Sequence, residues 1–218
     1  MVGELMKEDG VQLASEIDRD PFKTLIRTIL SARTRDDQTI KVSSILFEQY
    51  DTPKKLANAD PDRVREIIRP IGFYNSKTKY IMDTSRMLIE QHGGSVPNKF
   101  KDLVALPGVG SKVANCVLVY AFGIPAIPVD THVHRIVNRW GLVDTPDPKS
   151  THKQLVDILP RKWWLLINDL LIRFGKEICK PIGPQCDNGC PLAPCCPKLV
   201  KKTRGKKRTK PRKPGNKK

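Results

Sequence analysis

Apolar residues recur at intervals of three and four along most of the chain, which is the period of an amphipathic helix. Val64, Ile67 and Ile68 follow this spacing, and Leu171 and Phe174 do so nearer the C-terminus. The pattern contains no convincing pair of strands. It therefore predicts an all-α fold.

Short polar residues followed by proline mark where several of these helices begin. Asp20-Pro21 predicts a helix that runs to Ser31, because aspartate caps a helix and proline suits its first position. Further helices are predicted over 36–50, after Thr52 and Asp60, and over 75–91. Glycines in the left-handed conformation are expected to end helices at Gly93, Gly123, Gly141 and Gly175.

The charge balance indicates a polyanionic partner. Lysine and arginine number 39 against 23 acidic residues, which gives a formal net charge of +16. Eleven of the basic residues, and no acid, lie in 201–218, so a net charge of +5 remains on the rest of the chain. We expect 199–218 to be a disordered basic tail and the body of the chain to carry specific recognition.

The cysteines and the N-terminus bear on the compartment. No secretion signal or span of roughly 18 apolar residues is present, so we expect a cytoplasmic monomer, nucleoid-associated if prokaryotic, without a membrane partner. In a reducing compartment, cysteines crowded between 179 and 196 indicate metal ligands. The set Cys179, Cys186, Cys190 and Cys196 suits zinc or an iron–sulfur cluster, and spacing alone favours zinc only slightly.

The segment Leu106–Lys112, LPGVGSK, lies between two predicted helices. Gly108 and Gly110 allow a tight turn around Val109 with exposed backbone N–H groups, and Ser111 is predicted to cap the helix that follows. Such a turn at a helix N-terminus binds phosphate oxygens. A plain interhelical turn would use the same residues, and the segment alone does not separate the two interpretations.

Lys112 is expected in the first turn of that helix, where the positive end of the helix dipole disfavours an ammonium ion. Partial burial would act in the same direction and leave more of the neutral amine, which is a nucleophile. The ordinary alternative is a solvated lysine, or one that pairs with phosphate. For a lysine taken alone, that alternative is favoured.

Asp130 precedes another helical pattern, and the commonest use of such an aspartate is an N-cap. A carboxylate fixed there also suits a catalytic task, because it can stabilise positive charge at a sugar C1′ or take a proton from an attacking amine. The two roles are compatible. His132 and His134 would project from different faces of the helix, which favours structural or DNA-contact roles over a shared metal.

Five segments taken together resemble endonuclease III, a family of helix-hairpin-helix DNA glycosylases. In chain order they are Leu30–Asp36 (LSARTRD), Ile71–Lys77 (IGFYNSK), Leu106–Asn115 (LPGVGSKVAN), Val129–Arg135 (VDTHVHR) and the four cysteines. The match covers about residues 15–198. It implies a two-lobed all-α fold with DNA between the lobes, one lobe formed by 1–20 and 126–198 around the cluster loop and the other by 21–125.

The resemblance also implies roles for particular residues. Lys112 takes the position of the Schiff-base lysine and Asp130 that of the catalytic aspartate. Gly108, Val109, Gly110 and Ser111 are expected to bind DNA, and the four cysteines a [4Fe-4S] cluster rather than zinc.

This sequence departs from the family pattern at Arg33, at Phe73 and in the cysteine segment. Arg33 stands where glutamine typically fills the space left by the extruded base, and Phe73 where leucine is common as the wedge. Three residues rather than two separate Cys186 from Cys190, and Cys195 adjoins Cys196, which keeps the usual final interval.

The function implied is a bifunctional DNA glycosylase and abasic-site lyase of base excision repair, acting on oxidised pyrimidines in double-stranded DNA. A glycosylase for thymine or uracil opposite guanine is the alternative within the superfamily, although Lys112 argues against its monofunctional form. From other classes, a non-catalytic DNA-binding module leaves Lys112 and Asp130 without a use. An electron carrier leaves most of the chain unexplained.

Overall fold

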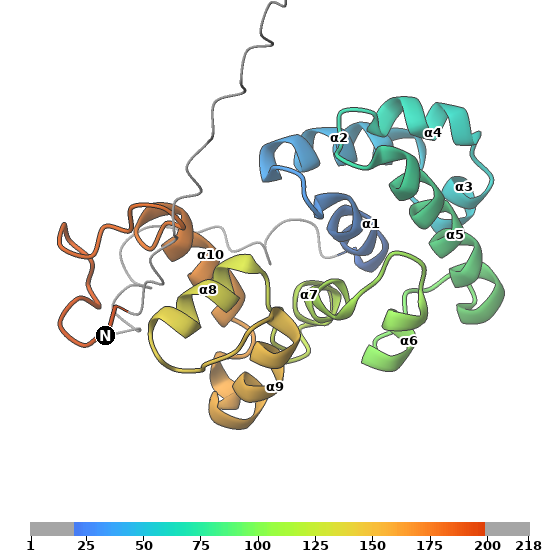
Figure 1. Cartoon of the computed structure of the whole chain (residues 1–218). Coiled ribbons are helices and arrows are strands. Elements are labelled where there is room, and N and C mark those ends of the chain that lie inside the picture. Colours follow the sequence, from blue (N-terminus) through green and yellow to red (C-terminus); the bar gives the residue numbers. More distant parts are fainter. Residues whose placement is uncertain (1–19, 199–218) are drawn as a thin grey trace, which may run out of the picture.

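Every regular element of residues 20–198, the part of the chain described by this computed structural model, is a helix (Figure 1). This confirms the predicted all-α fold. In chain order the elements are α1 (Pro21–Ser31), α2 (Asp36–Gln49), α3 (Pro53–Ala57), α4 (Pro61–Ile68), α5 (Tyr74–His92), α6 (Phe100–Ala105), α7 (Ser111–Phe122), α8 (Thr131–Arg139), α9 (Pro148–Ile158), the 3₁₀ helix η2 (Arg161–Trp163) and α10 (Ile167–Glu177). None of these helices is long and apolar enough to cross a membrane.

The predicted helix starts are confirmed by side-chain caps. Asp20 Oδ1 accepts hydrogen bonds from the backbone N–H groups of Phe22 and Lys23, at 2.8 and 3.1 Å. Thr52 and Asp60 cap α3 and α4 in the same way. Each cap satisfies donors that the first helical turn leaves without a partner, which is worth about 1 kcal/mol.

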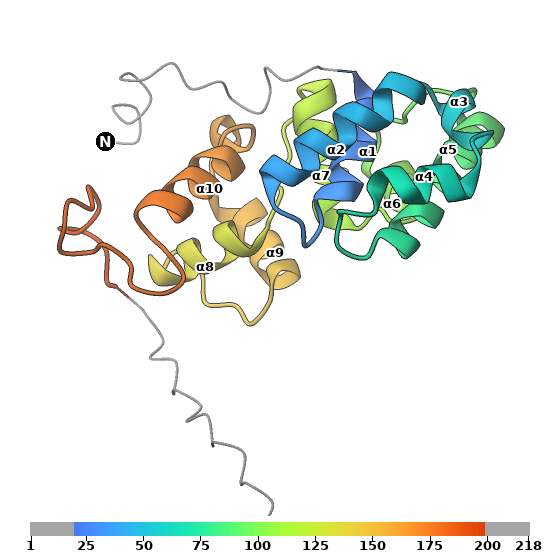
Figure 2. The ribbon, with the colours of Figure 1, turned by 90° about the horizontal axis from the view of Figure 1, so that it is seen from above.

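The described residues, 20–198, form two hydrophobic cores. The larger gathers buried side chains from Phe22 to Ala126, and the smaller gathers them from Ile127 to Cys179. Figures 1 and 2 show α1–α7 on one side and α8–α10 on the other. The lobe assignment made for residues 1–19 and the predicted basic tail 199–218 lie outside the described residues.

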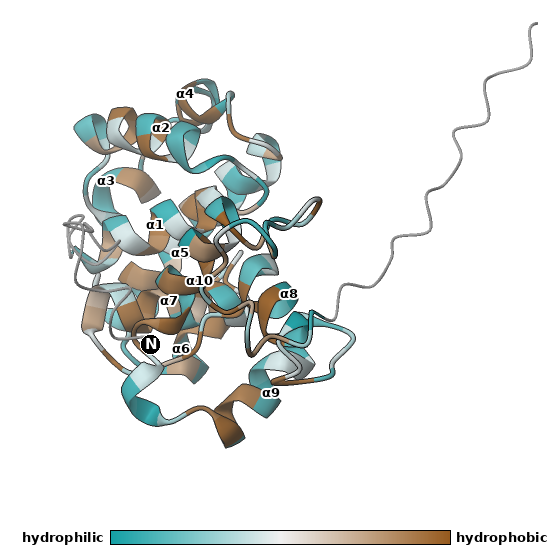
Figure 3. Ribbon diagram, turned by 90° about the vertical axis from the view of Figure 1, so that its left-hand side faces the viewer, coloured by the Kyte–Doolittle hydropathy of each residue, from teal (hydrophilic) through white to brown (hydrophobic). Residues whose placement is uncertain are grey.

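Helix α7 lies where the two halves meet. Figure 1 shows it nearly end-on between the other helices of the first half and α8 and α9, and Figure 3 colours most of its length as hydrophobic. Its residues from Val113 to Val119 are all buried. A helix that is apolar nearly all round is expected where neighbours cover it on every side.

One of the glycines expected to end a helix has a different role. Gly93, Gly123 and Gly141 have the predicted left-handed backbone, with φ of 59°, 63° and 67°. Gly175 instead lies inside α10, where an added Cβ would clash with His132 and come within 2.8 Å of Arg135 Nη2. The prediction for Gly175 is wrong, because this glycine allows α10 to approach α8 closely rather than ending a helix.

Candidate active site

A rigid hairpin joins α6 to α7. Gly108 has a φ of +74°, and a Cβ there would come 2.8 Å from the Tyr80 side chain on α5. Thr84, also on α5, donates a hydrogen bond to the carbonyl oxygen of Pro107 at 2.7 Å, and Val109 is buried beneath the turn. The turn is therefore fixed to the larger core before any ligand binds.

The N-terminus of α7 is open to solvent. Gly110 holds the N-cap position without a side-chain cap, and both Gly110 and Ser111 are exposed. The prediction that Ser111 caps the helix is wrong, because Ser111 is already the first helical residue and Gly110 supplies the extended backbone before it. The first N–H groups of α7 are thus available to an anion.

Lys112, the second residue of α7, is half-buried. Residues four apart share a helix face, which places Cys116 and Tyr120 in line with it. Burial raises the pKa of the Cys116 thiol, an effect opposed by the charge of Lys112 and reinforced by those of Asp130 and Asp169. Groups from α7, α8 and α10 therefore gather around the Lys112 side of the helix.

Asp130 is the N-cap of α8, as predicted. Its Oδ1 accepts hydrogen bonds from the backbone N–H groups of His132 and Val133, both at 2.8 Å. Both bonds use the same oxygen, so they fix the carboxyl group without occupying Oδ2. A fixed carboxylate of this kind can accept a proton or stabilise positive charge.

Arg33 and Phe73 lie together on an exposed surface of the first half. Both have left-handed backbones, with φ of 54° and 59°, although neither is glycine. The Arg33 guanidinium stacks over the Phe73 ring at 5.3 Å, and Phe73 is 61% exposed. Left-handed backbone at residues other than glycine costs free energy and is concentrated at functional sites.

The buried ammonium of Lys77 fixes the loop that carries Arg33. Its Nζ donates hydrogen bonds to the carbonyl oxygens of Leu30 and Ala32, at 2.8 and 2.6 Å, and to Thr34 Oγ1 at 3.1 Å. Burial lowers the pKa of Lys77 to about 8. The Lys77 backbone N–H also donates to the carbonyl oxygen of Phe73, so Lys77 connects the loop of Arg33 to Phe73.

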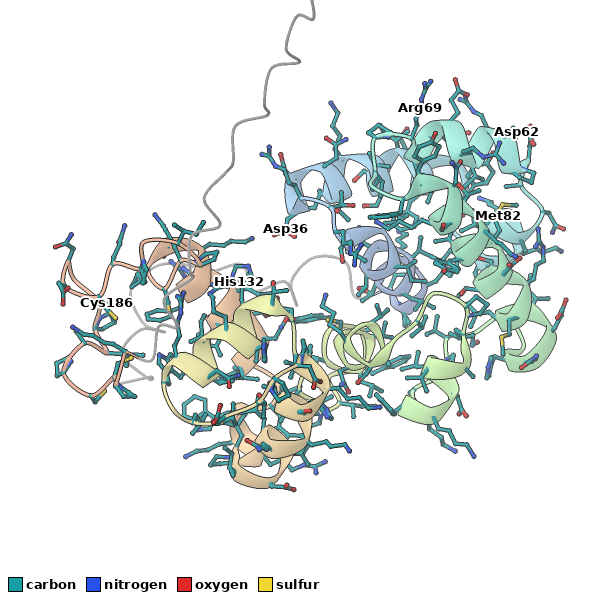
Figure 4. The ribbon with its side chains drawn as sticks, in the orientation of Figure 1. Asp36, Asp62, Arg69, Met82, His132 and Cys186 are labelled. Atoms are coloured by element: carbon teal, nitrogen blue, oxygen red, sulfur yellow. The ribbon has the colours of Figure 1, made fainter. Side chains whose placement is uncertain are left out.

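The cysteine segment follows α10 and lies at the edge of the molecule, where Figure 4 labels Cys186. Arg139 on α8 lies beside two of the cysteines: its Nη1 donates to Cys179 Sγ at 3.4 Å, and its carbonyl oxygen accepts from Cys196 Sγ at 3.9 Å. Cys195 is exposed, whereas Cys196 is partly buried. This arrangement favours Cys196 over Cys195 as a ligand.

The donor set fits an iron–sulfur cluster in type and number, since four thiols lie within one short segment. Hydrogen bonds from Arg139 and from the Lys198 N–H to sulfur are of the kind that thiolate ligands accept. Within residues 20–198, however, no three His, Cys, Asp or Glu side chains are close enough together to hold a metal ion. The segment supplies the ligands without gathering their sulfur atoms.

The two histidines beside Asp130 have separate contacts. His132 Nδ1 lies 3.3 Å from Arg135 Nη2, and His134 Nδ1 lies 2.7 Å from Thr151 Oγ1. Burial lowers the pKa of His132. These contacts agree with the prediction that the rings project from different faces of the helix.

Comparison with known proteins identifies the family. The model of the HhH-GPD superfamily of base excision DNA repair proteins matches residues 26–161. The endonuclease III of Thermotoga maritima is 48% identical over 170 residues, which are 78% of this chain and 80% of that protein. The chain belongs to the HhH-GPD superfamily and, within it, to the endonuclease III family that its motifs resemble.

Solved structures agree with this membership. Two endonuclease III–DNA complexes, one non-covalent and one a trapped covalent intermediate, each have a TM-score of 0.82 and 36% identity to this chain; each match covers 90% of this chain, and 90% and 91% of theirs. A thermostable thymine-DNA glycosylase has a TM-score of 0.77 and 26% identity, covering 87% of this chain and 89% of its own. The two-lobed helix-hairpin-helix fold expected from the sequence is thereby confirmed.

The superfamily match includes the hairpin, Lys112 and Asp130 but ends before the four cysteines. Sequence reasoning missed Tyr120 and Asn168, which connect the two halves, and also Arg139 on α8, which contacts the cysteine segment. The available signal was a polar pair, Asn168-Asp169, within the apolar stretch that begins α10. Buried polar side chains in such a stretch need partners, and here they have them.

Proposed function

We propose that this member of the HhH-GPD superfamily is a bifunctional DNA glycosylase and abasic-site lyase that removes oxidised pyrimidines from double-stranded DNA. The observation that carries the proposal is that Lys112 in the first turn of α7 and Asp130 at the start of α8 both act on the pKa of the Cys116 thiol, beside a hairpin whose helix end is open. The relatives named endonuclease III and the trapped covalent complex of one endonuclease III support it.

The hairpin would hold the DNA backbone. Amide groups around Gly108–Ser111 would donate to a phosphate, aided by the positive end of the α7 dipole. No side chain of the hairpin is needed for this contact, which explains a turn built from two glycines and an exposed serine. The basic residues of the chain would add affinity that does not depend on base sequence.

Arg33 and Phe73 would occupy the space left when the damaged base leaves the helix stack. Base chemistry at C1′ requires such extrusion, which costs a few kcal/mol of stacking and pairing. An exposed aromatic ring stacked on a guanidinium offers two flat surfaces to the neighbouring bases. The strained backbone at both positions would already hold them in the inserted orientation.

Lys112 and Asp130 would carry out the chemical steps. The neutral amine of Lys112 attacks C1′, and the C1′–N bond breaks with its electron pair leaving on the base. Asp130 takes a proton from the attacking nitrogen and stabilises the positive charge that develops at C1′. The resulting imine acidifies the C2′ hydrogen, and loss of that proton expels the 3′ phosphate by β-elimination.

The four cysteines Cys179, Cys186, Cys190 and Cys196 would bind a [4Fe-4S] cluster as thiolates. When bound, such a cluster supplies a cross-link that orders the segment around it. We also infer two lobes, one of 21–125 and the other of 126–198 with 1–20, and a monomer that acts on chromosomal DNA in the cytoplasm or nucleoid.

The test is covalent trapping with borohydride on three duplexes, carrying an oxidised pyrimidine, an abasic site or a thymine opposite guanine. The proposal expects a trapped complex with the first two and none after Lys112→Gln, whereas Lys153→Gln, at an exposed lysine on α9, should trap like the unaltered chain. Excision confined to the thymine–guanine duplex would favour the mismatch alternative. Binding without excision or trapping would favour the non-catalytic module.

A further inference from the structure

Three polar side chains join the two halves beside Asp130. The Tyr120 hydroxyl, on α7, lies 2.7 Å from Asn168 Oδ1 and 2.7 Å from Asp169 Oδ1, both on α10. Asn168 is 1% exposed, and its Nδ2 donates to the carbonyl oxygen of Pro128 at 2.9 Å. Pro128 is two residues before Asp130, so these bonds link the helix of Lys112 to the segment that carries Asp130.

The orientation of the Asn168 amide is set by its neighbours. The Pro128 carbonyl oxygen can only accept a hydrogen bond, so the group facing it must be the Asn168 NH₂. The amide oxygen therefore faces the Tyr120 hydroxyl, as the 2.7 Å contact has it. Rotating the amide by half a turn would place two acceptors in contact within the buried interface, which is costly.

The number of protons available for these hydrogen bonds then indicates whether the Asp169 carboxyl group is protonated. The Tyr120 hydroxyl has one proton to donate but lies 2.7 Å from two oxygens, and the one on Asn168 can only accept. If Tyr120 donates to Asn168, the short contact with Asp169 is a hydrogen bond only if the carboxyl group carries a proton and donates it. With an ionised Asp169, both contacts would have to share the one Tyr120 proton in a weaker three-centre bond, whereas a protonated Asp169 gives each contact a proton of its own.

The charges around Asp169 have opposing effects. Its place in the first turn of α10 favours an ionised carboxyl group through the helix dipole. Burial raises the pKa of Asp169, although a hydrogen bond from Tyr120 opposes this effect. Asp130 and Asp169 both raise the pKa of the Tyr120 hydroxyl, after the larger effect of its burial, so the two carboxyl groups act on the same small region.

We propose that Asp169 carries a proton at neutral pH and donates it to Tyr120, which donates to Asn168, which in turn donates to Pro128, so that this directed chain positions Asp130 opposite Lys112. The proposal rests on the function proposed above, because it assigns the chain to the pair that performs that reaction. None of the three side chains is required to touch the DNA, so they are positioning residues.

The protonation state can be measured without any activity. An infrared difference spectrum of the unaltered chain minus Asp169→Asn, at neutral pH, should contain the C=O stretch of a protonated carboxylic acid. Labelling aspartate with ¹³C at the carboxyl carbon should shift this band. A difference spectrum that contains only carboxylate bands would overturn the proposal.

Two substitutions interrupt this chain of hydrogen bonds, and one preserves it. Tyr120→Phe and Asp169→Leu remove a link, and each should lower the single-turnover excision rate at saturating enzyme by about tenfold, the effect of one net hydrogen bond on a barrier. Asp169→Asn restores a donor of the same shape in place of the protonated acid and should stay within about threefold of the unaltered chain. Affinity for an abasic-site analogue should be unchanged in all three.

The outcomes separate this inference from the proposed function. If the unaltered chain does not excise or trap, the proposed function fails, while the infrared measurement still tests Asp169. If the unaltered chain is active and Asp169→Asn is as slow as Asp169→Leu, the side chain acts as an anion and the inference fails. Tyr120→Phe deletes a single oxygen, so it tests the chain of hydrogen bonds even if Asp169→Leu does not fold. An unchanged excision rate in Tyr120→Phe would also overturn the inference.

Discussion

The start of α7 and the cysteine segment 179–196 carry the two sets of residues to which chemistry is assigned, and the polypeptide organises them differently. At the starts of α7 and α8, the hairpin and the Asp130 carboxyl group are fixed by the chain itself. Gly108 packs against Tyr80, Thr84 holds Pro107, and the Asp130 carboxyl group accepts two backbone hydrogen bonds.

In the cysteine segment, Arg139 holds the first and last of the four cysteines, and turn hydrogen bonds together with the Lys198–Asp187 ion pair hold the loop between them. Arg139 contacts Cys179 and Cys196, while Cys186 and Cys190 lie on a turn-rich loop between them. A site built from backbone geometry and packed side chains forms from the polypeptide alone. Thiolate ligands repel one another, so their sulfur atoms come together only around the metal or cluster that they bind.

The largest change in activity is expected from a substitution at Asp130. Asp130→Asn keeps a side-chain oxygen that can cap α8 but removes the negative charge, so folding should persist while the single-turnover excision rate falls about 10²–10⁴-fold. Asp147 caps α9 through the same two kinds of hydrogen bond, and Asp147→Asn is the matched control that should leave the rate unchanged. A rate loss of equal size in both would mean that capping alone is measured.

The next effect is expected in the cysteine segment. Cys196→Ser should lose the bound iron, whereas the adjacent Cys195→Ser should keep it, because Cys196 faces Arg139 and Cys195 is exposed. Iron analysis and the visible absorption of protein purified without air are the measurements. Loss of iron in Cys195→Ser alone would reverse the ligand assignment, and stoichiometric zinc would replace the proposed cluster.

Removing the iron should also loosen the cysteine segment without loosening the hairpin. Because the hairpin is packed on the larger core, limited proteolysis of iron-depleted protein should cut within 179–198 and leave the segment from α1 to α7 intact. Cleavage of the hairpin at the same rate would contradict the view that the chain alone organises it.

A smaller effect is expected in the hairpin. Gly108→Ala should lower the free energy of unfolding by about 1–3 kcal/mol, because the residue has φ of +74° and its Cβ would meet Tyr80. Gly110→Ala is the matched variant, since nothing lies within 4 Å of its added Cβ. It should lower stability less than Gly108→Ala does, because it changes only an N-cap preference of a few tenths to about 1 kcal/mol, but it should weaken DNA binding, because a methyl group would stand where the phosphate approaches.

The smallest effect is a pH dependence at Lys77. Its pKa is lowered from 10.5 to about 8, so between these values the unfolded chain binds more protons than the folded chain. The contribution of Lys77 to stability therefore becomes more favourable as pH rises from 8 to 10.5. The difference in unfolding free energy between the unaltered chain and Lys77→Met, measured by urea titration, should rise over this range; a flat or falling difference would contradict the assignment.

The parts of this fold that the sequence predicts correctly are those set by neighbouring residues. Asp20, Asp60 and Asp130 were correctly predicted as helix starts, because capping depends on residues two or three positions apart. The left-handed Gly93 and Gly123 were correct for the same reason. Ser111 and Gly175 were wrong, because a cap shifted by one residue and a close helix contact are decided by packing.

Contacts between distant segments account for what the sequence could not predict. Tyr120 and Asn168 are 48 residues apart, and Lys77 reaches Leu30 across 47 residues. No spacing rule connects such pairs. The motifs identified Lys112 and Asp130, whereas the side chains proposed to position them emerged only from the folded chain.

The most direct test of the account is to find which residue is bound to DNA after borohydride reduction. The trapped complex with an abasic duplex would be digested with protease and nuclease, and the peptide that carries the residual sugar would be sequenced by mass spectrometry. The account predicts that the modified residue is Lys112, at the open start of α7. Modification of any other lysine, or of the N-terminal amine, would contradict it.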